Sequence, residues 1–218
     1  MNLSYLNFIT ISTAKKYLGL IIAFIFPFVL LQLAVSGVLK SQGFELGFWL
    51  LSIFLVIYAI KFEGKTLKEM GFKPVSLITV GASLGLALVL YLLFFISDFA
   101  IVAFGLSSSM DTVLLISQLP VTSLFLIAMR AAVTEEIIFR AYPIETLSRN
   151  SKNYLLVGGL PLLFFVLSHL AWGIGHLVFV LLGGTVLTAF YIWKRNIWVN
   201  ILGHFLFDFS ILLIAPKI

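Results

Sequence analysis

The sequence predicts an all-α fold, a polytopic membrane helical bundle of about seven to eight transmembrane helices. Three observations lead to this fold class: 61% of the residues are hydrophobic, only 11% are charged, and the mean hydropathy is +1.16. These values lie far outside the composition of soluble globular proteins. Apolar runs long enough to cross a bilayer as helices also follow one another along the whole chain.

The apolar runs can be placed in order along the chain. The first follows Lys15 and Lys16 and is too long for an ordinary signal peptide, so we expect a retained signal anchor. The fourth contains Pro120, which predicts a break because proline has no backbone N–H for the helix interior. The predicted spans are residues 17–39, 46–60, 75–96, 113–142, 154–172, 176–193 and 197–215.

Domain organisation follows from the absence of any shift in composition. We expect one integral membrane domain over residues 1–218, with spans and a charged inner loop in 1–112 and a motif-bearing core in 113–218. The charged stretch at 61–74 is predicted to lie on the inner membrane surface as a short amphipathic helix. Cysteine is absent, which excludes disulfides, thiolate metal sites and a cysteine nucleophile.

Loop charges orient the spans, because Lys and Arg concentrate on the cytoplasmic side of membrane proteins. With the N-terminus inside, only Lys40 and Lys217 fall in outer segments. We therefore predict a multi-pass protein of a cell membrane, bacterial by its small size, with a cytoplasmic N-terminus. The net charge of +5 then reflects topology and attraction to the lipid bilayer, not nucleic-acid binding. The predicted inner bases are Lys15, Lys16, Lys61, Lys65, Lys68, Lys73, Arg149, Lys152, Lys194 and Arg195.

Two adjacent glutamates lie inside a predicted span, where a charge costs about 2.5–3.5 kcal/mol on insertion scales. Glu136 and Arg140 are four residues apart, so they share a helix face and are expected to pair. Glu135 points elsewhere and has no evident local partner. A functional carboxylate is one interpretation, and an interfacial salt-bridge cluster without chemistry is the other.

Histidines lie in two further spans. His169 follows Phe165 by four residues, and His204 precedes Asp208 by four on one helical face. A buried hydrogen bond between helices would explain one such pair. Because three spans carry ionisable groups, we favour a single water-accessible cavity where Glu135, His169, His204 and Asp208 converge.

These residues resemble the three motifs of the CPBP family of intramembrane proteases, also called the Abi or type II CAAX prenyl endopeptidase family. The motifs are E-E-x-x-x-R at Glu135, Glu136 and Arg140, F-x-x-x-H at Phe165 and His169, and H-x-x-x-(N/D) at His204 and Asp208. They occur in that order on separate apolar segments between about residues 120 and 213. His176 matches no motif and is expected to lie outside the site.

The resemblance implies a glutamate-dependent endopeptidase within the bilayer. Glu135 would activate water, His169 would position it, and His204 with Asp208 would bind the oxyanion. Glu136, Arg140 and Phe165 would support the site. Asp208 fits least well, because an ionised carboxylate repels an oxyanion. It would act as a neutral donor, which we favour because burial opposes ionisation, or it would orient His204.

We expect no cofactor, and the alternative is a zinc ion held by two histidines and a glutamate. The expected partner is a peptide or protein substrate, prenylated in one version, that reaches the cavity from the inner side. A non-catalytic membrane protein is the competing function, either an immunity-type partner or a proton-coupled transporter. Paired repeats typical of transporters are not evident in the sequence, which favours the protease.

Overall fold

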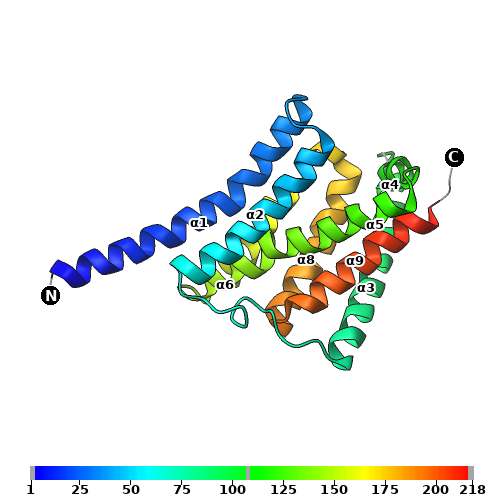
Figure 1. Ribbon diagram of the computed structural model, residues 1–218. Helices are drawn as coiled ribbons and strands as arrows, with labels where there is room; N and C mark the ends of the chain where they lie inside the picture. Colours follow the sequence, from blue (N-terminus) through cyan, green and yellow to red (C-terminus); the bar gives the residue numbers. More distant parts are fainter. Residues whose placement is uncertain (1–2, 107–108, 216–218) are drawn as a thin grey trace.

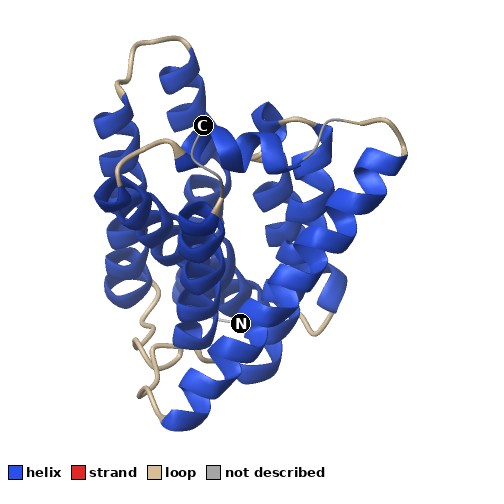
Figure 2. Ribbon diagram, turned by 90° about the vertical axis from the view of Figure 1, so that its right-hand side faces the viewer, coloured by secondary structure: helices blue, strands red, loops and turns tan. Residues whose placement is uncertain are grey.

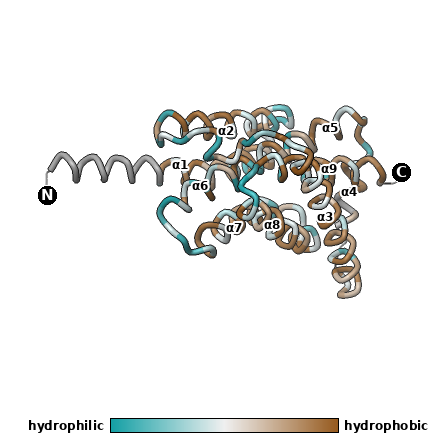
Figure 3. The backbone as a smooth tube through the Cα atoms, turned by 90° about the horizontal axis from the view of Figure 1, so that it is seen from below, coloured by the Kyte–Doolittle hydropathy of each residue, from teal (hydrophilic) through white to brown (hydrophobic). Residues whose placement is uncertain are grey.

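The computed structural model describes residues 3–106 and 109–215, and the regular elements in this part of the chain are all helices. Figure 1 and Figure 2 show these helices gathered into a bundle. Figure 3 shows that hydrophobic residues dominate the helices and that hydrophilic stretches are short. The predicted all-α fold is confirmed. Within residues 3–106 and 109–215, five helices are long and apolar enough to cross a membrane, which supports a multi-pass membrane protein.

Five of the seven predicted spans coincide with single helices. Gly37 closes the turn after the first of them with a φ of 74°, a conformation that glycine adopts without a steric penalty. This helix also begins well before the predicted start at residue 17. The five are α1 (Leu3–Val35), α2 (Ser41–Phe62), α3 (Leu77–Ala103), α8 (Ile174–Lys194) and α9 (Ile197–Ile214).

The other two predicted spans are each divided into several shorter helices, a division that the sequence analysis expected only at Pro120. Pro120 does break the first of them, as predicted, and stands immediately before α5. That span consists of α4 (Ser109–Ser117), α5 (Val121–Arg130), the π-helices η1 (Ala131–Glu135) and η2 (Ile137–Ala141), and α6 (Tyr142–Ser148). The second consists of the π-helix η3 (Leu155–Gly159), α7 (Leu160–Leu167) and the 3₁₀-helix η4 (Leu170–Trp172).

Two glycines allow close packing between these elements. A Cβ on Gly203 of α9 would lie 2.9 Å from the side chain of Leu86 in α3. A Cβ on Gly19 of α1 would collide with the ring of Tyr142 at the start of α6. The α1–α2 hairpin therefore contacts the segment that carries the predicted glutamates, and α3 packs tightly against the helix that carries His204.

The predicted amphipathic helix at 61–74 is wrong, because residues 63–76 form turns and extended backbone. Gly64 and Gly71 have φ angles of 63° and 84°, which do not belong to a right-handed helix. Lys65 and Met70 are 2% and 0% exposed. The segment thus points side chains into the protein, and its shape is set by tertiary contacts that a helical charge pattern does not reveal.

Three of the predicted inner loops meet at one end of the bundle. The backbone N–H of Ile197 donates to the carbonyl of Gly71 at 2.8 Å, and Arg149 pairs with Glu69 at 3.0 Å. Figure 1 shows the turn with Lys40 at the opposite end of the hairpin. We call the end with these loops the basic end. Lys217 lies outside the described residues. The grouping of the loops agrees with the predicted topology, while the side of the membrane they face stays a prediction.

A buried ion pair lies at the basic end of the bundle. Glu63 and Lys65 lie 2.8 Å apart, and their side chains are 1% and 0% exposed. Tyr142 donates to Glu63 at 2.5 Å, and the Lys65 amino group also donates to Thr146. Burial lowers the pKa of Lys65, and the hydrogen bond and charge of Glu63 oppose this shift.

We predict that Glu63→Gln lowers the free energy of unfolding by about 3–5 kcal/mol, because it leaves the Lys65 ammonium buried without a counter-charge. Thermal unfolding of the purified protein in detergent measures the change. Glu69→Gln is the matched control, because its pair with Arg149 is largely exposed and should contribute little. Equal melting of the two variants would contradict the prediction.

Candidate active site

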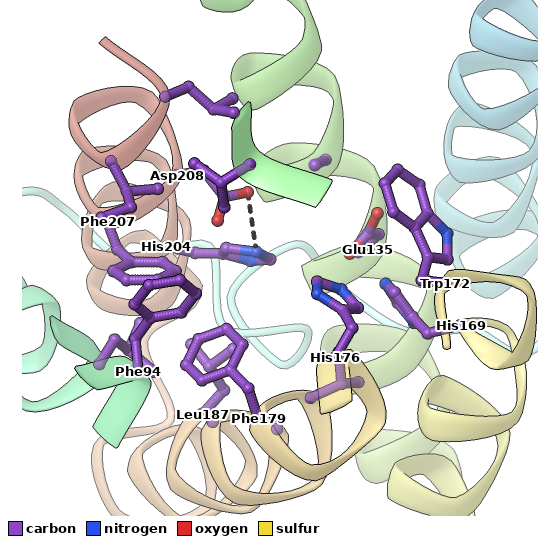
Figure 4. A pocket seen from close by; sticks show the side chains of 18 of the residues that line it. Phe94, Glu135, His169, Trp172, His176, Phe179, Leu187, His204, Phe207 and Asp208 are labelled. Atoms are coloured by element: carbon purple, nitrogen blue, oxygen red, sulfur yellow. Dashed lines mark ion pairs between the residues drawn. The ribbon is translucent and has the colours of Figure 1, made fainter. Parts of the chain in front are cut away.

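A pocket of about 160 Å³ lies inside the bundle. Figure 4 shows Glu135, His169, His176 and His204 directed toward its centre. The walls come from α3, α4, α5, η1, η4, α7, α8 and α9. The structure therefore brings the side chains of the predicted catalytic residues Glu135, His169, His204 and Asp208 to one cavity.

Glu135 has a partner that the sequence analysis did not predict. Arg130 donates from Nη1 to Oε1 of Glu135 at 3.0 Å and from Nε to Oε2 of Glu45 at 2.9 Å. The expectation of an isolated carboxylate is wrong because η1 is a π-helix. Its hydrogen bonds run from i to i+5, so the wider turn places residues five apart on one face.

Glu136 is fully buried and forms the centre of a polar network. Its Oε1 accepts from Arg140 at 2.9 Å, which confirms the predicted pair, and lies 3.0 Å from Nδ1 of His204. Its Oε2 accepts from the amide of Asn200 at 3.0 Å. Asn200 also donates to the carbonyl of Leu187 at 2.8 Å. Glu136 therefore links the glutamate segment to both α8 and α9.

Phe165 explains how the second motif contributes to this network. Its ring lies 4.1 Å from the guanidinium of Arg140, whose Nε and Nη2 have no hydrogen-bond partner among the described residues. The aromatic face therefore covers the buried cation. Phe165 also packs edge-on against His169 at 4.8 Å, and its carbonyl lies 2.8 Å from Nδ1 of His169. Because a carbonyl only accepts, Nδ1 carries the proton, and Nε2 is the acceptor in a neutral ring.

His204 and Asp208 face each other along α9, as their spacing predicted. Nε2 of His204 lies 3.3 Å from Oδ2 of Asp208. Both ring nitrogens of His204 therefore lie beside a carboxylate, one from Glu136 and one from Asp208. The side chain of Asp208 is 25% exposed, so the burial that favoured its neutral form in the sequence analysis is incomplete.

His176 lies in the pocket wall, a position that the sequence analysis did not expect. It begins α8 beside Trp172 of η4, with ring centroids 5.5 Å apart, and its ring lies 6.0 Å from that of His169. Nδ1 of His176 is buried without a hydrogen-bond partner among the described residues. Motif spacing could not reveal this position, because the α7–α8 turn brings it back to the pocket.

Other contacts were also missed by the sequence analysis. Asn200 lies four residues before His204 and eight before Asp208, so extending the helical spacing backwards would have found it. Glu45 comes from a distant helix and left no local signal. Among the described residues, no group of three His, Asp or Glu side chains is arranged to hold a metal ion. The absence of a cofactor remains a prediction.

The pocket extends away from the basic end. Phe179 and Val180 lie in the first half of α8, and Ile211 and Leu212 lie in the second half of α9. The basic end holds the end of α8 and the start of α9, where Ile197 contacts Gly71. Entry of a substrate from the inner side stays a prediction.

The fold and pocket define a helical membrane protein with a cluster of ionisable groups inside the bundle. Residues 117–210 match the model of the family described as Type II CAAX prenyl endopeptidase Rce1-like. The match confirms the family resemblance predicted from the three motifs, and it covers every predicted catalytic residue. Since this is a protease family, the match supports a hydrolase. Comparisons with curated proteins and with solved structures gave no match.

We predict that Glu136→Gln destabilises the fold by about 3–5 kcal/mol, because the buried guanidinium of Arg140 loses its counter-charge. Chemical or thermal unfolding in detergent tests this. Glu135→Gln provides the control, because Arg130 keeps its contact with Glu45 in that variant. The structural role of Glu136 fails if its variant unfolds like the wild type.

Proposed function

We propose that this protein is an intramembrane endopeptidase that hydrolyses peptide bonds with water activated by Glu135. One observation carries the proposal: the glutamate and the two motif histidines line the same pocket, although they come from three separate segments. The family match over residues 117–210 supports proteolysis as the chemistry.

The groups in the pocket suit the steps of amide hydrolysis. A water molecule loses a proton to Glu135 while its oxygen bonds to the substrate carbonyl carbon. Nε2 of His169 accepts a hydrogen bond from this water and positions it. The resulting oxyanion accepts a hydrogen bond from the Nε2–H of His204, which it shares with Oδ2 of Asp208 at 3.3 Å. Glu135 then passes its proton to the leaving nitrogen as the carbon–nitrogen bond breaks.

Asp208 is proposed to orient His204. Its Oδ2 is 3.3 Å from Nε2 of His204, and its side chain is 25% exposed. A carboxylate beside an imidazole fixes the ring and favours an N–H that can donate. The neutral-donor role makes the opposite prediction for an Asn substitution, so one variant distinguishes the two.

The substrate is proposed to be a peptide or protein segment with an apolar group near the cleaved bond. Phe94, Phe179 and Phe207 line one wall of the pocket (Figure 4). A prenylated C-terminal peptide offers such a group, and so does an unmodified apolar segment. We also propose that the basic end faces the cytoplasm of a cell membrane, since basic loops favour that side.

We predict that Glu135→Gln abolishes cleavage of an internally quenched, farnesylated peptide ending in a CAAX tetrapeptide, because the amide cannot accept a proton from water. The protein should remain folded. Fluorescence in liposomes reports cleavage, and an unprenylated version of the peptide tests the lipid requirement. Equal activity of the variant and the wild type would falsify the proposed function and favour a non-catalytic protein.

We predict that Asp208→Asn lowers kcat at least about 10-fold, because loss of the carboxylate that orients a catalytic histidine lowers kcat strongly. The amide cannot balance the charge of the His204 ring. Steady-state cleavage of the same peptide measures the effect. Wild-type activity in the Asn variant, with loss only in Asp208→Ala, would instead establish Asp208 as a neutral donor.

A further inference from the structure

Arg130 lies between two carboxylates from different parts of the chain. Nη1 contacts Glu135 at 3.0 Å and Nε contacts Glu45 at 2.9 Å. Its guanidinium carbon also lies 5.2 Å from the ring centre of Phe48 and 5.9 Å from that of Phe44. Glu45, Phe44 and Phe48 belong to α2, which precedes the family match at residues 117–210.

The geometry of this contact depends on both the helix and the side chain. The π-helical turn aligns Arg130 with Glu135. A planar guanidinium can then donate in two directions at once, which a single ammonium group does less well. The Arg130 side chain is 11% exposed, so its orientation is fixed by the two carboxylates and the α2 aromatics.

One oxygen of Glu135 is occupied by this contact. Arg130 donates to Oε1, and Oε2 is then the oxygen directed at an attacking water. Because Glu45 shares the same guanidinium, the positive charge acting on Glu135 is divided. The carboxylate is thereby held in place by a guanidinium that it shares with Glu45.

The other charged or titratable groups near Glu135 belong to a separate network. Glu136 is bound by Arg140 and Asn200, and His204 bridges Glu136 and Asp208. The remaining titratable groups that line the pocket are His169 and His176. Arg130 is therefore the cation in direct contact with Glu135.

We infer that Arg130, tethered by Glu45, is the positioning residue of Glu135, so that the α1–α2 hairpin takes part in aligning the active site. The inference rests on the proposed endopeptidase function. It assigns a role to two residues outside the three motifs and to a helix outside the matched region.

Steady-state cleavage of the farnesylated CAAX peptide tests the inference in Arg130→Gln, Arg130→Lys and Glu45→Gln. Arg130→Gln should lower kcat by about 10- to 100-fold, because a misplacement of about 1 Å in the reacting groups can cost about 100-fold, with little change in KM. Arg130→Lys should keep part of the kcat that Arg130→Gln loses, because lysine keeps the positive charge but lacks the planar guanidinium that donates in two directions. Glu45→Gln should lower kcat less than Arg130→Gln. Glu69→Gln, far from the pocket, serves as the control with unchanged kcat.

Melting temperatures distinguish a positioning role of Arg130 from a role in folding. Melting temperatures of Arg130→Gln, Glu45→Gln and the double variant should be non-additive, because the two residues form one contact. Unchanged kcat in active variants, a loss confined to KM, or no rescue by Lys would overturn the positioning role alone. A wild type that does not cleave the peptide would overturn the proposed function and the positioning role with it, while the melting temperatures still report whether the tether exists.

Discussion

Charges buried among apolar helices must find partners, and this requirement organises the centre of the molecule. Desolvation of an ion costs several kcal/mol, so an unpaired carboxylate or guanidinium would not persist there. Glu136 meets the requirement with Arg140 and Asn200, and Glu135 meets it with Arg130. Each partner comes from a fixed position on a helix, so satisfying the charges also fixes how the helices pack around the pocket.

The irregular helical segments follow from the same requirement. The π-helix η1 ends at Glu135, and the π-helix η2 begins directly after Glu136. Glu136 and Arg140 are four residues apart, whereas Arg130 and Glu135 are five apart, a spacing that a regular α-helix does not place on one face. The wider turn allows both glutamates to pair in opposite directions, one toward α2 and one toward α9. The distortion is therefore the local solution that lets two neighbouring carboxylates serve separate networks.

Sequence reasoning succeeded where the signal was local and periodic. Long apolar runs predicted five helices, and spacings of four residues predicted both the Glu136–Arg140 pair and the His204–Asp208 pair. It failed where tertiary contacts decide the outcome. The shape of the charged segment after α2 is set by its glycines and by the burial of Lys65. His176 reaches the pocket because the chain turns between α7 and α8. Neither outcome follows from helical periodicity.

The contacts of Glu45 and Tyr142 show why the N-terminal hairpin matters to a site that the family match places elsewhere. The matched residues 117–210 supply every side chain of the three motifs. However, α2 supplies Glu45, which contacts Arg130 in the pocket wall, and Gly19 of α1 leaves room for the Tyr142 ring. Tyr142 in turn donates a hydrogen bond to Glu63, which lies just after α2. The hairpin thus contacts the glutamate segment at both ends, Arg130 on one side and Tyr142 on the other. A segment held at both ends has little freedom to shift along its axis, and this restriction keeps Glu135 opposite His169, which follows α7, and His204 of α9.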